Sequence, residues 1–147
     1  MAVGETEVRA GADIPELRRA VTTEDVHGYA EASGDRNPLH LDDHVARGVG
    51  FPSVIAHGML TMGHLASCLT SWLGDGGRIV RLRTPFRAVV LPDDVIVAGG
   101  RVKTVDDLAR RAVLEVWVTV ERDGATEYPI RRGEAEVELV GTTRVHS

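Results

Sequence analysis

One segment of the chain is apolar at the spacing of an amphipathic helix. From Gly58 to position 73, apolar side chains recur three and four residues apart, and the glycine-rich segment 74–77 ends the run. Several intervening positions are apolar too, so the pattern predicts a helix over 58–73 that is buried on most sides. The apolar positions are Met59, Leu60, Met62, Leu65, Ala66, Cys68, Leu69, Trp72 and Leu73.

Beyond this segment the apolar positions alternate with polar ones, which is the period of a β-strand with one buried face. The alternation begins between Val80 and Phe86, and strand-like stretches follow at 95–105, 112–121 and 130–140. Such a sheet must bury its apolar face, and the apolar helix is the only large partner that the sequence offers. The pattern predicts an α+β fold in which an antiparallel sheet curls around the long helix.

A shorter helix is predicted before these elements. Thr22 or Thr23 can cap its start, acidic residues follow in its first turn, and Gly34 suits the left-handed position after its end, which places it at about 23–33. From position 36 to 53, prolines and glycines interrupt any regular pattern. We therefore expect a long connection there, of the kind that often carries function.

Composition limits the classes of protein that remain. The 147 residues are 43% hydrophobic, enough for one core, so a single domain over 1–147 is expected. A formal charge of −5 argues against nucleic acid as a partner. The chain has neither an apolar run of roughly 20 residues nor a signal-peptide pattern, so no membrane span and a cytoplasmic protein are expected. The single cysteine, Cys68, excludes an internal disulfide and is expected in the core.

The irregular connection holds a carboxylate and an imidazole close together, at Asp35 and His40. Pro38 between them fixes its own φ and favours an extended Asn37, so the backbone itself restrains the pair. A histidine can exchange a proton near neutral pH, and a nearby carboxylate can orient it or share a water with it. The residues alone leave two interpretations open, a catalytic pair or an aspartate that binds local amides beside a packed histidine.

Two stretches resemble a known enzyme family. Ser-Gly-Asp-Arg-Asn-Pro-Leu-His at 33–40, followed by Ala46, resembles the hydratase motif of MaoC-like dehydratases and (R)-specific enoyl-CoA hydratases. Ile-Ala-His-Gly-Met-Leu at 55–60 is similar to the segment that opens the central helix of these hot-dog-fold enzymes. The run 56–63 also resembles the catalytic subunits of mycobacterial (3R)-hydroxyacyl-acyl-carrier-protein dehydratases. Ala66 departs from the pattern, because some hydratases have a serine there.

The resemblance implies a reversible hydration of trans-2-enoyl thioesters to (3R)-3-hydroxyacyl thioesters, carried by CoA or an acyl carrier protein. In this interpretation Asp35 and His40 hold a water, with His40 as the preferred base and the microscopic roles interchangeable. Gly58 would offer the free amide of a helix start to the developing enolate oxygen, and its lack of a Cβ lets the carbonyl approach. The supporting loop residues are Ser33, Asn37 and Pro38.

Further residues are candidates for contact with the substrate. They are His57, Met59, Met62 and Arg83. Arg83 belongs to a basic strand with Arg78, Arg81 and Arg87. Those arginines either meet CoA phosphates or an acidic carrier protein, or form a solvated face of the sheet.

No metal or other cofactor is expected. His40 and His44 share a spacing that can hold a metal, but Leu41 stands where a zincin has its glutamate, and Pro38 opposes a helix across the pair. Asp42, Asp43 and His44 are therefore expected on a solvated turn. Neither a flavin nor a nicotinamide is implied.

A single hot-dog unit implies a second one, either an identical copy or a related subunit. In a heterodimer this chain would be the catalytic member, because it keeps the aspartate–histidine pair. Two other functions stay open. One is a hot-dog acyl thioesterase, which sends water to the carbonyl carbon, and the other is a non-catalytic acyl-binding or assembly subunit.

Overall fold

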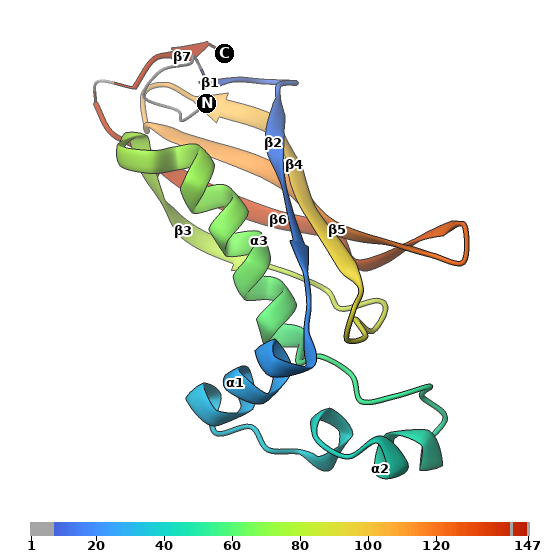
Figure 1. The fold of residues 1–147 in the computed structure, drawn as a ribbon. Helices are drawn as coiled ribbons and strands as arrows, with labels where there is room; N and C mark the ends of the chain where they lie inside the picture. Colours follow the sequence, from blue (N-terminus) through green and yellow to red (C-terminus); the bar gives the residue numbers. More distant parts are fainter. Residues whose placement is uncertain (1–7, 142, 147) are drawn as a thin grey trace.

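The computed structural model describes residues 8–141 and 143–146, and its long helix lies across a curved sheet (Figure 1). The five-stranded sheet is antiparallel and has the order β2-β4-β5-β6-β3. Its strands are β2 (Asp13–Ala20), β3 (Gly77–Arg83), β4 (Val95–Asp106), β5 (Arg111–Arg122) and β6 (Ala125–Leu139). A second, two-stranded sheet pairs β1 (Val8–Arg9) with β7 (Val145–His146) in parallel.

The helical elements fall into two groups. The long helix is α3 (Gly58–Leu73), which the short 3₁₀ turn η2 (Gly74–Gly76) follows. The other group lies beyond the N-terminal end of α3 and away from the sheet (Figure 1). Its members are α1 (Thr23–Ser33), the 3₁₀ turn η1 (Pro38–His40) and α2 (Asp43–Gly48). Among the helices of the described ranges, none is both long and apolar enough to cross a bilayer.

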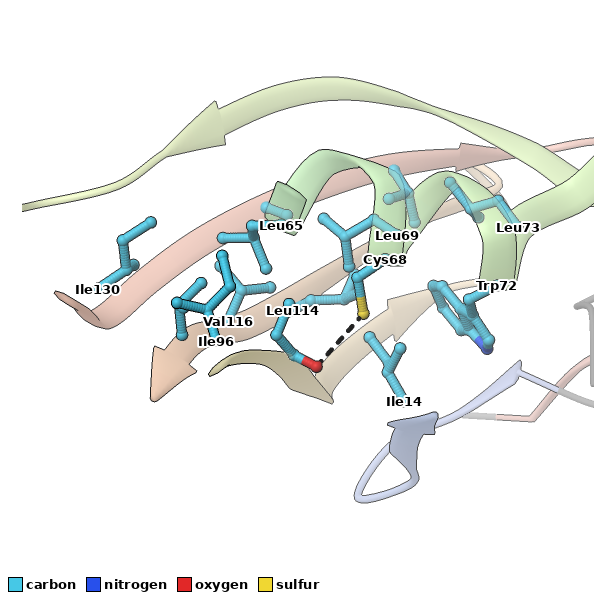
Figure 2. Packing of buried hydrophobic residues seen from close by; sticks show 14 of the residues in the cluster. Ile14, Leu65, Cys68, Leu69, Trp72, Leu73, Ile96, Leu114, Val116 and Ile130 are labelled. Atoms are coloured by element: carbon cyan, nitrogen blue, oxygen red, sulfur yellow. Dashed lines mark hydrogen bonds between the residues drawn. The ribbon is translucent and has the colours of Figure 1, made fainter. Parts of the chain in front are cut away.

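The core forms where α3 meets the concave face of the sheet. Leu65, Leu69 and Leu73 recur every four residues along α3 and are at most 1% exposed. Alternate residues of β5, among them Leu114 and Val116, face them and are fully buried (Figure 2). Burial of one such side chain stabilises the fold by roughly 1.5–3 kcal/mol, so this interface dominates the folding free energy.

The predicted arrangement of helix and sheet is confirmed, and so are both predicted helices. The helix expected at about 23–33 is α1. Thr22 accepts from the Asp25 amide at 3.0 Å, and the Asp25 carboxylate accepts in turn from the Thr22 amide at 2.9 Å. This backbone bond from Thr22 holds the pKa of Asp25 below its usual value. Gly34 closes the helix with φ 78°, the left-handed geometry that its lack of a Cβ allows.

The prediction that the segment 36–53 is irregular was wrong, because η1 and α2 lie within it. The residues expected on a solvated turn begin α2 instead. The Asp42 carboxylate caps this helix, accepting from the amides of His44 at 2.9 Å and Val45 at 3.3 Å. Asp43 accepts from the Val54 amide at 2.9 Å and ties the helix to the chain that follows. The capping carboxylate of Asp42 therefore marks the start of a helix that the hydrophobic pattern does not show.

The sheet differs from the prediction at its edges. β2 was not predicted, because Ile14 is its only buried residue and Pro15 interrupts it at a register shift. Proline has no amide to donate, which an edge strand tolerates. β3 ends at Arg83, so the alternation expected through Phe86 was too long, and Phe86 makes only an isolated bridge to Ile130.

Cys68 and His64 of α3 are buried and bond to backbone carbonyls. The Cys68 thiol donates to the carbonyls of Pro15 and Ala98, the latter along the dashed line in Figure 2. Burial raises the pKa of this thiol to about 11, so Cys68 is an inert core residue. His64 is 6% exposed, and its Nε2–H donates to the Leu17 carbonyl at 2.9 Å. Burial lowers the pKa of His64 below its usual value.

Candidate active site

The loop after α1 is shaped by a series of short-range hydrogen bonds. The Ser33 hydroxyl accepts from the Asp35 amide at 3.1 Å, the Asp35 carboxylate accepts through Oδ1 from the Asn37 amide at 3.2 Å, and the Asn37 side chain accepts from the Leu39 amide at 3.1 Å. Pro38 is the first residue of η1, where a missing amide hydrogen costs nothing. These bonds leave the second carboxylate oxygen of Asp35, Oδ2, free to face the next turn.

That oxygen faces His40. Nδ1 of His40 lies 2.6 Å from the Ile55 carbonyl oxygen. A carbonyl only accepts, so Nδ1 carries the hydrogen and the neutral ring presents its lone pair at Nε2. Nε2 lies 3.9 Å from Oδ2 of Asp35, too far for a direct hydrogen bond and a suitable span for a shared water. The structure brings together the two residues that the sequence paired.

A second histidine lies behind this pair. His57 is 2% exposed, and its Nε2–H donates to the backbone carbonyl of Asp35 at 2.9 Å. Its ring stacks on that of His40 with centroids 3.8 Å apart and planes inclined by 20°, and Tyr29 packs against it at 4.8 Å. Sequence reasoning placed His57 among the substrate contacts. The structure buries it behind the Asp35–His40 pair, where it bonds to the Asp35 backbone and stacks on His40.

The start of α3 adjoins these histidines. His57 makes no side-chain cap, and the first amides of a helix have no intrahelical acceptor, so Gly58 and Met59 present free N–H groups at the positive end of the helix dipole. A Cβ on Gly58 would meet the ring of Phe86 at 3.2 Å. A helix start with free amides and no Cβ favours a negatively charged oxygen, which is the arrangement expected of an oxyanion site.

The remaining residues predicted to contact the substrate differ in their exposure. Met59 is 54% exposed beside Gly58, whereas Met62, one turn further along α3, is half-buried. Arg83, at the end of β3, is exposed and lines an open cavity. Their contact with substrate stays a prediction. Sequence reasoning missed Phe86 as a site residue, although an exposed aromatic side chain just after a strand was a usable signal.

The cluster of Asp35, His40 and His57 offers three ligand atoms within 4.8 Å of one another. An ion binds an imidazole close to the plane of the ring. The stacked planes of His40 and His57 are inclined by only 20°, so they meet far from both rings. As folded, therefore, only one of these histidines could bind an ion together with Asp35, and the geometry suits proton transfer better than metal binding.

Comparisons with known proteins show what this chain is similar to. The family model described as "MaoC like domain" matches residues 8–124. A 3-hydroxybutyryl-CoA dehydratase from Methylorubrum extorquens is 35% identical over 105 residues, which cover 71% of this chain and 67% of that protein. The family match and this relative confirm the resemblance that the two motifs indicated.

Solved structures extend the comparison to the fold. An (R)-hydratase from A. caviae, involved in PHA biosynthesis, superimposes with a TM-score of 0.79 at 28% identity, covering 88% of this chain and 96% of that one. The ChsH1–ChsH2 complex from Mycobacterium tuberculosis contains a chain with a TM-score of 0.74 at 19% identity, over 88% and 97% of the two chains, a likeness of fold alone. The predicted hot-dog fold is thereby confirmed.

Proposed function

The chain belongs to the MaoC-like dehydratase family and is a hydro-lyase that adds water to, or removes it from, acyl thioesters, and we propose that Asp35, His40 and Gly58 carry out this reaction. The observation that supports the proposal is the 3.9 Å gap between the His40 imidazole and the Asp35 carboxylate, next to the free amides of α3. The substrates proposed are trans-2-enoyl and (3R)-3-hydroxyacyl thioesters of CoA or of an acyl carrier protein. No cofactor enters the reaction.

In the hydration direction, His40 acts as the base. Its Nε2 takes a proton from a water held between His40 and Asp35, and the water oxygen forms a bond to Cβ of the enoyl group. The electrons of the Cα=Cβ bond move toward the carbonyl and leave an enolate. The proton then returns to Cα from His40 or through Asp35, which restores both groups. Dehydration is the reverse sequence.

The enolate oxygen is stabilised at the start of α3. The amides of Gly58 and Met59 are fixed by the helix before the reaction begins, so they need no reorganisation as charge develops. One such donor contributes about 3–4 kcal/mol of transition-state stabilisation. The absent side chain at Gly58 lets the carbonyl approach beneath the ring of Phe86.

His57 has a positioning role in this proposal. Its Nε2–H fixes the backbone of Asp35, and its ring fixes the plane of His40. Both reacting side chains are thus held by one buried residue. Catalysis depends on such placement, because a shift of about 1 Å in a reacting group can cost on the order of 100-fold in rate.

The experiment that tests this function follows two products at once. Purified protein is mixed with trans-2-butenoyl-CoA, and the loss of the enoyl absorbance is recorded beside the release of free thiol. Hydration consumes the enoyl group without releasing thiol and yields the (3R)-hydroxy product. Thiol release in step with substrate loss would identify a thioesterase instead. An inert protein that still binds the thioester would support the non-catalytic alternative.

We also propose that two hot-dog units pair along β3, either identical copies or this chain with a related subunit. β3 pairs with β6 on one side, and within the described part of the chain no strand pairs with its other side. Phe86 and Met59 expose large apolar surfaces nearby, and unpaired edges beside such surfaces favour association. Light scattering is expected to give about twice the mass of 15.9 kDa, or a complex with a co-expressed subunit.

Two further expectations belong to the proposal. The chain is taken as one domain over residues 1–147, and its location as cytoplasmic. Limited proteolysis tests the first, because a single domain is not cut into two fragments that each stay folded. Fractionation of cells that express the protein tests the second.

A further inference from the structure

Four arginines gather where the end of β3 and the middle of β6 lie side by side. The Arg87 amide donates to the Pro129 carbonyl at 2.9 Å, and the neighbouring residue, Phe86, bridges to Ile130. These contacts bring the chain after β3 against β6. We refer to Arg83, Arg87, Arg131 and Arg132 as the arginine cleft. They line two open cavities of about 610 and 490 Å³ that share Arg132.

The backbone of β6 is bent at this place. Consecutive residues of a regular strand face opposite sides, yet Arg131 and Arg132 are both exposed. The pairing of β5 with β6 shifts register between Gly133 and Ile130, and Arg132 has φ 57°. A residue other than glycine at positive φ is strained, and a bulge that re-aims side chains often lies next to a functional site.

The charge of the cleft is largely uncompensated. Several arginines elsewhere on the sheet pair with carboxylates, as Arg78 does with Glu138 at 3.2 Å. In the ranges that the structure covers, the four arginines of the cleft make no ion pair. Glu127 lines the same cavity but is neutralised by Arg122 at 2.6 Å. Glu134 is opposite Arg83 in register, which leaves one carboxylate against four guanidinium groups.

The chain that carries the cleft also borders the proposed oxyanion site. Phe86 is the connection, since its ring reaches to within 3.3 Å of where a Cβ of Gly58 would stand, and Arg87 is the next residue. Gly58 and Arg87 are therefore linked through a single residue, Phe86. An extended molecule with a reactive end and an anionic end fits this layout.

We propose that the arginine cleft binds the phosphate groups at the nucleotide end of a CoA thioester, an inference that rests on the proposed function. Guanidinium groups bind phosphate oxygens through two parallel hydrogen bonds, which gives both affinity and orientation. Arg131 is held in position by the ring of Tyr128, 4.7 Å from its guanidinium carbon, so less side-chain entropy is lost on binding.

The same features disfavour an acidic carrier protein as the occupant. A stable protein interface covers about 800 Å² on each partner, whereas these basic groups line concave cavities of small-molecule size. The whole chain carries a formal charge of −5, so its surface outside the cleft repels an acidic protein. A compact phosphate-bearing ligand meets the basic groups without meeting the acidic remainder.

The test compares two substrates that carry the same acyl group, of which only one carries the nucleotide. Steady-state hydration is measured with trans-2-butenoyl-CoA and with the N-acetylcysteamine thioester, which lacks the phosphates. The variants are Arg87→Gln, Arg131→Gln and their combination with Arg132→Asn, since asparagine tolerates positive φ. Arg18→Gln, an exposed arginine on β2 without an ion pair, is the matched control for loss of one charge.

The triple variant is expected to raise KM for the CoA thioester about tenfold or more, with kcat within about twofold and the N-acetylcysteamine substrate unaffected. The control leaves both substrates unchanged. An unchanged KM for CoA overturns the proposal, and so does an equal loss on both substrates. The same variants are also assayed with an acyl-carrier-protein thioester, and a loss confined to that substrate overturns the proposal in favour of protein docking.

Direct binding separates this proposal from the proposed function. Adenosine 3′,5′-bisphosphate, the nucleotide end of CoA, is titrated calorimetrically into the wild type and the triple variant. Saturable binding that the variant weakens about tenfold supports the cleft even if no hydration is found. Absence of binding to the wild type, together with normal hydration of the CoA thioester, rejects the cleft and leaves the reaction in place.

Discussion

The buried face of α3 and the loop that precedes it are stabilised in different ways. Leu65 and Leu69 on α3 are fully buried against the sheet, whereas every side chain from 33 to 45 is exposed or half-buried. The loop is shaped instead by directed bonds such as that from the Asp35 amide to the Ser33 hydroxyl. Burial has no preferred direction and supplies most of the free energy of folding, while the directed bonds supply geometry. Stability and catalysis should therefore respond to different substitutions.

Substitution of the proposed catalytic pair tests the loop side of this contrast and should have the largest effect. Asp35→Asn and His40→Asn are expected to lower kcat by roughly 10²- to 10⁴-fold, because neither can exchange a proton near neutral pH. Asparagine at 35 keeps the acceptor for the Asn37 amide, and asparagine at 40 keeps a donor for the Ile55 carbonyl. Steady-state hydration is the measurement.

Asp35→Asn should unfold within about 0.5 kcal/mol of the wild type in urea, because its side chain is 55% exposed. His40→Asn removes a ring that is 12% exposed and stacked on His57, so it is expected to cost roughly 0.5–3 kcal/mol. His44→Gln, a nearby exposed histidine outside the site, is the control and should retain full activity. Near-normal turnover in either variant of the pair would show that the substituted residue is neither the base nor its partner.

The opposite substitution is made in the core. Leu69→Ala should lower the free energy of unfolding by about 2–5 kcal/mol, through lost burial and the cavity that remains. Leu108→Ala is the control, since Leu108 is 99% exposed and should cost less than about 0.5 kcal/mol. Chemical denaturation measures both. At temperatures where Leu69→Ala stays folded, its kcat should match that of the wild type. A large loss of kcat would show that core packing also determines activity.

Gly58 lies where the two regions meet. Gly58→Ala places a methyl group 3.2 Å from the Phe86 ring, in the space proposed for the carbonyl oxygen. We expect kcat/KM to fall by about 10²- to 10³-fold with little loss of stability, because the displaced oxygen loses its amide donor. The double variant Gly58→Ala, Phe86→Leu relieves the contact between the side chains. Full recovery in the double variant would show that ring displacement, and not the carbonyl site, caused the loss.

His57 combines burial with directed bonds, and two variants separate these properties. His57→Phe keeps a ring against His40 but removes the donor to the Asp35 carbonyl, whereas His57→Gln keeps a donor and removes the ring. Each is expected to lower kcat about tenfold with KM within about twofold, as a positioning residue should. A raised KM at unchanged kcat would instead make His57 a substrate contact, as the sequence suggested.

The smallest expected effect is the contribution of buried His64 to the pH dependence of the free energy of unfolding. Burial, opposed by the bond to Leu17 and assisted by the charge of Arg19, lowers the pKa of His64 in the folded state. The unfolded chain then binds more protons, so His64 contributes stability above its ordinary pKa of 6.5 that is lost as pH falls through the folded value. Unfolding free energies between pH 7.5 and 5 should fall more steeply in the wild type than in His64→Gln. Equal slopes would contradict this.

The sequence predicted what burial and local capping encode. Gly58 and the apolar residues after it define α3 without tertiary information, and the Asp35–His40 pair was identified by its resemblance to a hydratase motif. The position of His57 could not be predicted, because its bond to Asp35 joins residues 22 apart and depends on how α3 meets the loop. β2 was missed for a similar reason, since its pairing with β4 gives it a structure that its own pattern does not show.

The bonds that run from Ser33 to Leu39 each reach only two residues along the chain. Their geometry therefore owes little to the side chains that fill the space between α3 and the sheet. Mutations that widen, narrow or deepen that interior can accumulate while Asp35 and His40 keep their spacing. A scaffold of this kind can acquire new acyl-chain preferences by changing its hydrophobic residues, without having to rebuild its catalyst each time.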